Sequence, residues 1–229
     1  MTRRKIDAHP SVVLCFSPKR VRLLMGVYDE EYSKPAYRLS ANNLGGNPEP
    51  GEDSPENVLI REVSEEFDPN HALKKINLGH VSWSNPAAIR AVRNALLGNV
   101  IPFMDFYVEA GSIPGGNNPY SAVYSVFQSV IPEEVIDRVD LEIKNQRRMM
   151  GEGLFGIFTL DELANNPRGE FSTAYATAPI LNYKFDTKIP FPSTLIATVI
   201  GDPRASFKDY ESEFVYDSKA LVRASKAQI

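Results

Sequence analysis

The chain has 229 residues, of which 43% are hydrophobic and 24% charged, so it can form a packed core and is not intrinsically disordered. Its 29 Asp and Glu residues outnumber its 25 Lys and Arg residues, which gives a formal net charge of -4. This charge argues against a protein that binds nucleic acid mainly through phosphate contacts.

The sequence carries no signal for export or membrane insertion. No apolar run approaches the roughly 18 residues that a membrane helix needs, and the first residues lack a secretory apolar core. The single cysteine, Cys15, excludes an internal disulfide and a zinc site built from cysteines. We therefore expect a cytoplasmic protein that binds neither membranes nor nucleic acid.

The first part of the chain predicts a β-hairpin, a loop and a helix. Two apolar runs, 11–16 and 22–28, are separated by a turn sequence and predict two antiparallel strands. Residues 42–51 are dense in Gly, Pro and Asn and predict a loop. A helical pattern follows from Pro55 and ends at Asp68-Pro69, because the residue before proline disfavours helical dihedral angles.

The second part alternates strands and helices. An Asn85 cap and Pro86 at the first helical position predict an inserted helix over about 86–97. Strand composition and further helical patterns predict four strands, at 76–83, 101–108, 122–131 and 154–158, and two helices, from 132 to about 147 and at 160–163. Together these elements predict an α/β (α+β) fold with a mixed sheet between helices.

Three glutamates of the first helix share one of its faces. At about 100° per residue, with Glu62 set at zero, Glu65 falls near 300° and Glu66 near 40°. Leu59, Ile60, Val63 and Phe67 fall at roughly 60° to 160° and predict an adjoining apolar stripe that packs on the sheet.

The spacing of these acids favours a bound cation. Glu62 and Glu66 are like charges four residues apart, which destabilises an exposed helix by roughly 0.2–0.5 kcal/mol, and Arg61 offsets only part of this. Carboxylate oxygens are preferred ligands of Mg²⁺ and are accepted by Mn²⁺. The alternative is a solvated acidic face without a ligand.

The sequence around these acids resembles the signature of the Nudix hydrolase family. Gly46 is followed after five residues by Glu52, and after eight more, where the family has seven, by Arg61-Glu62-Val63-Ser64-Glu65-Glu66. Asp68-Pro69 replaces the usual Gly-aliphatic end. The resemblance implies a Nudix hydrolase domain over residues 1–165 that includes the inserted helix. Residues 166–229 would be an extension that packs on the same domain or forms a homodimer contact.

The resemblance implies Mg²⁺-dependent (or Mn²⁺-dependent) hydrolysis of a diphosphate linkage in a nucleoside diphosphate derivative. Glu62, Glu65 and Glu66 would hold the metal together with a backbone carbonyl of Gly45 or Gly46. One of the glutamates would accept a proton from water. Glu52 and Arg61 resemble the orienting residues of the signature, with a surface ion pair as the alternative for Arg61. Glu152, in a Gly-rich loop, is a candidate for a further ligand or base.

The substrate is not defined by the signature. A nucleotide sugar, ADP-ribose or a dinucleotide is the class that the resemblance implies, and it would release a nucleoside monophosphate. Arg90 and Arg93 are candidates for phosphate contacts, with solvated surface arginines as the alternative. Two other functions stay open, namely a nucleoside triphosphate pyrophosphohydrolase and a catalytically silent module that senses ligands or binds proteins.

Overall fold

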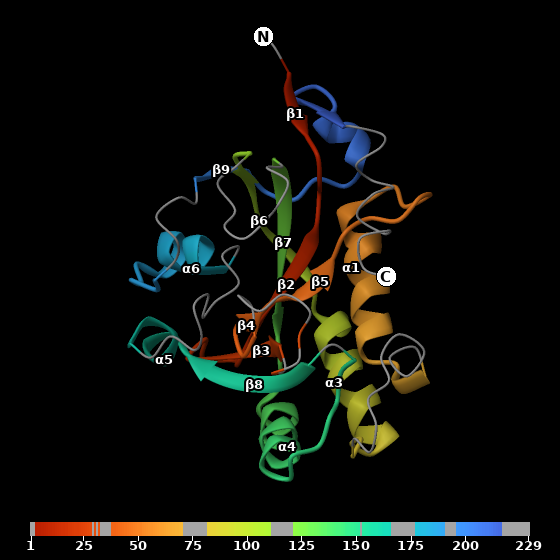
Figure 1. The fold of residues 1–229 in the computed structure, drawn as a ribbon, viewed down its shortest axis with the longest axis vertical. Helices are drawn as coiled ribbons and strands as arrows, with labels where there is room; N and C mark the ends of the chain where they lie inside the picture. Colours follow the sequence, from red (N-terminus) through yellow and green to blue (C-terminus); the bar gives the residue numbers. More distant parts are fainter. Residues whose placement is uncertain are drawn as a thin grey trace.

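The computed structural model describes residues 3–28, 30, 32, 38–70, 82–110, 121–151, 153–165, 177–190 and 196–216. Within these ranges eight strands form one large mixed sheet with helices on both faces, and two short strands form a separate parallel pair (Figure 1). None of the helices in the described ranges is long and apolar enough to cross a membrane.

The sheet is built around β2, which has a neighbour of each orientation. β2 pairs antiparallel with β3, as the hairpin prediction required, and parallel with β7. The strand order is β4-β3-β2-β7-β6-β9, while β5 also pairs with β2 and β8 with β3. The bounds are β2 (Ser11–Phe16), β3 (Arg22–Tyr28), β4 (Ala41–Asn42), β5 (Leu44–Gly46), β6 (Ile101–Val108), β7 (Ala122–Val130), β8 (Gly153–Thr159) and β9 (Ala197–Gly201).

Helices cover both faces because the central strands are apolar on both. Along β2, Val13 and Cys15 point to one hydrophobic cluster while Leu14 and Phe16 point to the other, as the two-residue period of a strand requires. The first cluster is covered by α1 (Pro55–Glu66), α3 (Pro86–Gly98) and α4 (Glu133–Lys144), and the second by α5 (Leu160–Asn165) and α6 (Thr177–Phe185). The predicted mixed sheet between helices is therefore confirmed.

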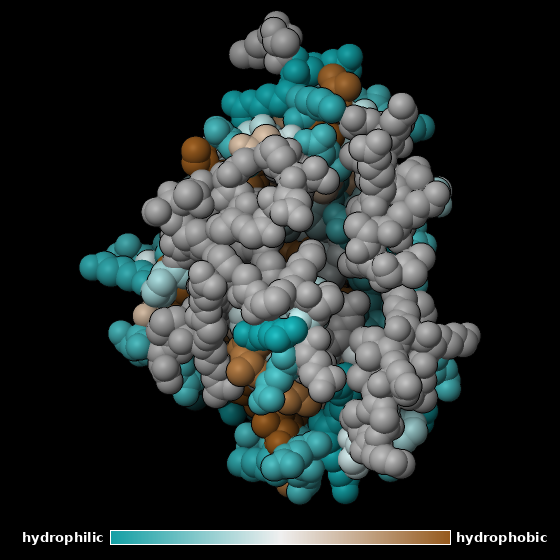
Figure 2. All heavy atoms as spheres, in the orientation of Figure 1, coloured by the Kyte–Doolittle hydropathy of each residue, from teal (hydrophilic) through white to brown (hydrophobic). Residues whose placement is uncertain are grey.

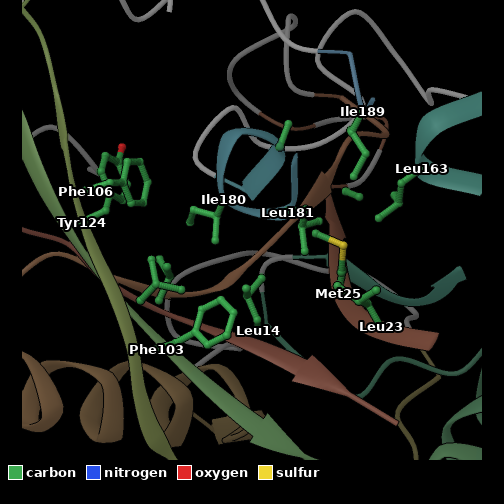
Figure 3. Close-up of a cluster of buried hydrophobic side chains, with 14 of the residues drawn as sticks. Leu14, Leu23, Met25, Phe103, Phe106, Tyr124, Leu163, Ile180, Leu181 and Ile189 are labelled. Carbon is green, nitrogen blue, oxygen red and sulfur yellow. The ribbon is translucent and has the colours of Figure 1, made fainter. Parts of the chain in front are cut away.

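The cluster under α6 is a hydrophobic core of buried side chains. Figure 3 shows Ile180 and Leu181 of α6 facing Leu14, Leu23 and Phe103 of the sheet. The surface contrasts with this: Figure 2 shows mostly hydrophilic side chains among the described residues on that face, with apolar residues gathered over β8.

Two predicted elements differ in their ends. α4 ends at Lys144 rather than near Arg147, because Gln146 adopts a left-handed φ of 55°. Gln146 N–H then donates to Ile143 O (2.9 Å) and Arg147 N–H to Glu142 O (3.0 Å), which closes the helix with a Schellman motif. The strand predicted at 76–83 lies largely outside the described residues, but Trp83 forms a parallel bridge with Arg148.

The end of the described chain contains structure that the sequence pattern did not predict. β9 extends the large sheet by pairing with β6, and β10 (Phe214–Tyr216) pairs parallel with β1 (Arg4–Ile6). Between them lies a short 3₁₀ helix, η2 (Phe207–Tyr210). These short elements have little periodicity of their own, and they are stabilised by partners that are distant in the sequence.

A buried polar cluster joins this C-terminal segment to the sheet. The Tyr210 hydroxyl donates to Asp105 Oδ2 on β6 (2.6 Å) and lies 3.2 Å from Ser125 Oγ on β7. His9 lies fully buried between Ser125 Oγ (2.9 Å from Nε2) and the Tyr216 hydroxyl (2.8 Å from Nδ1). Burial, and then the charge of Arg204, lower the pKa of His9 to about 3, so the ring is neutral at neutral pH.

Asp105 should make folding stability fall as the pH rises. Burial raises its pKa to about 6 from the usual value near 3.8, although hydrogen bonds from Tyr210 and Ser125 oppose this. Between these two pH values the folded protein binds more protons at this site than the unfolded chain does, so the Asp105 contribution is present at low pH and is lost as the pH rises through 6. The free energy of unfolding of wild type relative to Asp105→Asn should therefore decrease by up to about 3 kcal/mol between pH 4 and 7. Urea unfolding of both proteins across this range measures it, and a constant difference contradicts the raised pKa.

Candidate active site

The loop after β5 and the first turn of α1 form the centre of the candidate site. The Ser54 side chain caps α1 by accepting a hydrogen bond from Asn57 N (3.2 Å), and Pro55 takes the first helical position. Both residues suit these positions, since a cap oxygen satisfies one exposed N–H and proline has none to satisfy. α1 packs against β5 and β2 (Figure 1), and the carboxylate of Glu62, in the second half of the helix, lies against Gly46 of β5.

α1 is rotated relative to the orientation that the sequence pattern predicted. Leu59, Val63 and Phe67 are buried as expected, but Ile60 is 43% exposed and Val58 is completely buried. With Glu62 at zero, Val58 falls at about 320°, so the buried arc runs from about 320° to 140° and includes the positions of Glu62 and Glu66. The prediction that Ile60 belongs to the buried stripe is therefore wrong. Glu62, Glu65 and Glu66 are all half-buried, and the Glu62 and Glu65 side chains are 21% and 27% exposed.

Arg61 connects the loop to the acidic face of the helix. Its guanidinium donates to both carboxylate oxygens of Glu52, from Nε (2.9 Å) and Nη2 (3.2 Å), and to Glu62 Oε1 from Nη1 (2.9 Å). Nη2 also donates to the main-chain carbonyl of Asn47 (2.8 Å), and Nη1 lies 3.6 Å from Glu65 Oε2. The Arg61 side chain is only 20% exposed. A plain surface ion pair therefore does not describe it.

The charge of Arg61 is secured by its neighbours. Burial by itself would lower the pKa of Arg61, but hydrogen bonds and charges from Glu52 and Glu62 raise the pKa above its ordinary value. The pairs are therefore charge-assisted and partly shielded from water, a setting in which such bonds are stronger than neutral ones. Glu52 is further fixed because its Oε2 accepts from Glu49 N–H (2.6 Å).

Gly46 leaves room for the Glu62 carboxylate. A Cβ at position 46 would lie 2.4 Å from Glu62 Cδ and 2.5 Å from Oε1, so any other residue would displace this carboxylate. Gly45 is required for a different reason: its φ is 132°, and a Cβ there would lie 2.1 Å from Ser11 O. The two glycines thus allow the strand, the loop and the acidic helix to approach closely.

Glu66 lies at the end of α1, with its Oε2 atom buried. It lines a small hollow together with residues from β3, β4 and the loop before β8, namely Gly26, Val27, Tyr28, Asn42 and Met150. Burial, and then the charge of Glu66, raise the pKa of the Cys15 thiol, so this cysteine stays protonated. Gly151 N–H donates to Glu66 O (2.8 Å), which fastens the loop before β8 to the helix. The next residue, Glu152, lies outside the described residues.

The carboxylates do not form a ready-made metal centre in this structure. Among the described residues, no three His, Cys, Asp or Glu side chains converge to hold an ion. Glu62 and Glu65 instead face the guanidinium of Arg61. The donor set still suits a hard cation, because carboxylates and a closely approaching glycine backbone provide only oxygen ligands.

The two candidate arginines of α3 make no direct polar contact with the acids among the described residues, and their role in phosphate binding stays a prediction. Arg90 is exposed and Arg93 is half-buried. Within the described part of the chain, neither forms a hydrogen bond or ion pair with Glu62, Glu65 or Glu66. The sequence reasoning missed the main-chain carbonyl of Asn47, and no side-chain pattern could have indicated it, since every residue has such a carbonyl.

Comparisons with known proteins give structural similarities of low score. No family model matches the chain, and no curated protein matches it. Similar solved structures include a mutT/nudix family protein from Listeria innocua, with 15% identity, coverage of 80% of this chain and 94% of that chain, and a TM-score of 0.44. A Nudix hydrolase from M. smegmatis, RenU, has 10% identity, coverage of 83% and 90%, and a TM-score of 0.38. A MutT/nudix family protein from Enterococcus faecalis has 16% identity, coverage of 69% of this chain and 45% of that chain, and a TM-score of 0.34. At these scores the similarities support no conclusion about function. Function is inferred from the site residues instead.

The Arg61 network should be worth more to folding than a surface ion pair. Arg61→Lys keeps the charge but loses the two-pronged contact with Glu52 and the bond to Asn47 O, so we expect a loss of about 1–3 kcal/mol in the free energy of unfolding. Arg22→Lys is the matched control. Arg22 pairs with Glu133 where both side chains are about a third or more exposed, and its loss should stay below about 1 kcal/mol. Urea unfolding at neutral pH compares the two, and equal losses would contradict a special role for Arg61.

Proposed function

We propose that the protein hydrolyses a diphosphate linkage in a nucleoside diphosphate derivative, with Mg²⁺ or Mn²⁺ as cofactor, and releases a nucleoside monophosphate. The observation that carries the proposal is the ordered set Gly46, Glu52, Arg61, Glu62, Glu65 and Glu66, in which Arg61 binds Glu52 and Glu62 beside the Gly46 backbone. The order of these residues along the chain resembles the Nudix signature. The contacts supply a physical reason for three of its positions: glycine for space, arginine as a fork and Glu52 as its partner.

The carboxylates of Glu62, Glu65 and Glu66 and the Gly46 carbonyl would hold the metal. Support comes from the contact between Glu62 and the Gly46 backbone, which only a residue without a Cβ allows. A bound divalent cation neutralises charge on phosphoryl oxygens and lowers the pKa of a bound water. Orientation of the acids and acceptance of the proton from water are proposed for side chains of the protein.

Arg61 and Glu52 would orient the acidic face, and a glutamate would accept the proton. In the reaction a water oxygen forms a bond to phosphorus, the bridging P–O bond breaks, and a carboxylate of Glu62 or Glu65 takes the proton of the water. Glu152 is proposed as a further base or ligand, because its neighbour Gly151 bonds to Glu66 O at the end of the helix. Arg61 would keep Glu62 in one orientation by holding Oε1.

The substrate is proposed to be a small nucleotide derivative, such as a nucleotide sugar, ADP-ribose or a dinucleotide. The purified protein should release a nucleoside monophosphate from a member of this panel when Mg²⁺ is present, and chelation should stop the release. Glu62→Gln, Glu65→Gln and Glu66→Gln should each lower kcat at least about 100-fold. Ion-exchange chromatography of the products measures both effects.

Controls separate this proposal from its alternatives. Glu134→Gln changes an exposed acid in the first turn of α4 and should leave kcat unchanged. Release of inorganic pyrophosphate from a nucleoside triphosphate would indicate the pyrophosphohydrolase alternative. Thermal stabilisation by a nucleotide without turnover would indicate a silent binding module. Full activity of all three glutamine variants would overturn the assignment of the acids.

Gly46→Ala should remove activity with little loss of stability. The added methyl group displaces the end of the Glu62 side chain, which can move at small energetic cost, but the carboxylate then leaves its place beside the loop. Gly98→Ala is the control, because a Cβ at the end of α3 meets nothing within 4 Å. We expect kcat to fall at least about tenfold for Gly46→Ala only, with free energies of unfolding within about 1 kcal/mol of wild type. Steady-state kinetics and urea unfolding of both variants test this.

A further inference from the structure

The C-terminal segment contacts the loop of the candidate site directly. Phe207, the first residue of η2, donates its main-chain N–H to the carbonyl of Asp53 (2.9 Å). Asp53 lies between Glu52, which Arg61 holds, and Ser54, which caps α1. The bond therefore meets the loop at the point where it enters the acidic helix.

The residues on either side of this bond are already fixed by other contacts. The Asp53 side chain accepts from Asn57 Nδ2 (2.8 Å), and the Ser54 side chain accepts from Asn57 N. Glu52 N–H donates to Glu49 O (3.2 Å) within the loop. These contacts are local to the loop and the first turn of α1. The bond from Phe207 is different, because it connects the loop to a segment anchored elsewhere.

The anchor of this segment is the buried polar cluster described above. The Tyr210 hydroxyl donates to Asp105 Oδ2 on β6 and accepts from Arg204 N–H (2.8 Å). Tyr210 is completely buried, and the Phe207 ring packs edge-on against the His9 ring at 4.9 Å between centroids. The segment is thus attached to the central strands on one side and to Asp53 on the other. Figure 1 shows it beside β1, close to the start of α1.

We propose that the Phe207 N–H is a positioning group for the candidate active site. By holding the Asp53 carbonyl it fixes the loop 47–54, and the loop fixes Glu52, which orients Arg61 and through it Glu62. The catalytic consequence rests on the proposed function, whereas the structural consequence for the loop does not. Residues beyond 165 are then part of the scaffold of the site.

Two substitutions at position 207 test this hydrogen bond. Phe207→Pro deletes the N–H donor and places the ring Cδ where the hydrogen points at Asp53 O, so the carbonyl is released and must move away. Proline otherwise suits the first position of a helical turn. The preceding residue, Ser206, is extended (φ -143°, ψ 157°), which is the conformation that proline favours before it. Phe207→Ala is the matched control, because it also loses the ring but keeps the N–H. The difference between the two variants therefore reports the release of the Asp53 carbonyl, through the lost donor and the space that Cδ takes.

The first readout is hydrogen exchange of the metal-free protein, measured by mass spectrometry. Peptides that cover the loop 47–54 should exchange about two- to tenfold faster in Phe207→Pro than in Phe207→Ala, which corresponds to the loss of one hydrogen bond. Peptides from α4 should exchange equally in both variants. Equal loop exchange in the two variants overturns the proposal, whatever the enzyme does.

The second readout is steady-state kinetics with Mg²⁺ and the nucleotide substrate. Phe207→Pro should have a kcat about two- to tenfold lower than Phe207→Ala, with similar KM values, because the loop orients the acids rather than binding the substrate. Equal kcat values overturn the positioning role while leaving the proposed function intact. If wild type itself hydrolyses no nucleotide, the proposed function fails. The exchange experiment still decides whether the Phe207 N–H holds the loop 47–54.

A measurement on wild type covers the case in which Phe207→Pro does not fold. Amide exchange followed by NMR should give the Phe207 N–H and the Glu52 N–H similar protection, because the segment and the loop would open together. A Phe207 amide that exchanges without protection, while the Glu52 amide is protected, contradicts the proposal that the Phe207 N–H holds the loop.

Discussion

The Arg61 guanidinium is the group on which the geometry of the acidic helix depends. Its contacts join the site loop, through Glu52, to Glu62 and Glu65 of the helix. Without it the carboxylates repel one another, and the loop loses its attachment to the helix through Glu52 and Asn47 O. The fork shape of the guanidinium matters as much as its charge, since it bonds two carboxylates and a carbonyl at fixed angles.

The rotation of α1 makes this group necessary. A helix that turned only apolar residues to the sheet would leave its acids in water, where they need no compensation. Here Glu62 and Glu66 lie within the buried arc, and Ile60 is left exposed in exchange. Half-burying carboxylates costs solvation energy, and the contacts of Arg61 and the space at Gly46 offset that cost for Glu62. A local departure from hydrophobic patterning that is compensated in this way is characteristic of functional sites.

The sequence predicted those features that depend on neighbours along the chain. The spacing of apolar residues predicted the strands at 11–16 and 22–28 and the inserted helix from Pro86, and the grouping of the acids on one face of α1 followed from helical geometry. The wheel gives only relative angles, however, and the arc that is buried depends on β5 and β2, which pack against α1. The early end of α4 depends on Gln146, which is left-handed although it is neither glycine nor asparagine, the residues that usually take this conformation.

The C-terminal segment shows the limit of such reasoning most clearly. Its link to the site is a bond between two main-chain groups, Phe207 N–H and Asp53 O, which any pair of residues could form. This pair meets because the buried cluster around Tyr210 holds the segment in place, with the Tyr210 hydroxyl donating to Asp105 Oδ2. Contacts between such distant residues cost chain entropy, and these depend on β6 and β7, which carry Asp105 and Ser125. The loop beside the acids is therefore held by a part of the chain that lies outside the signature and is anchored on the sheet.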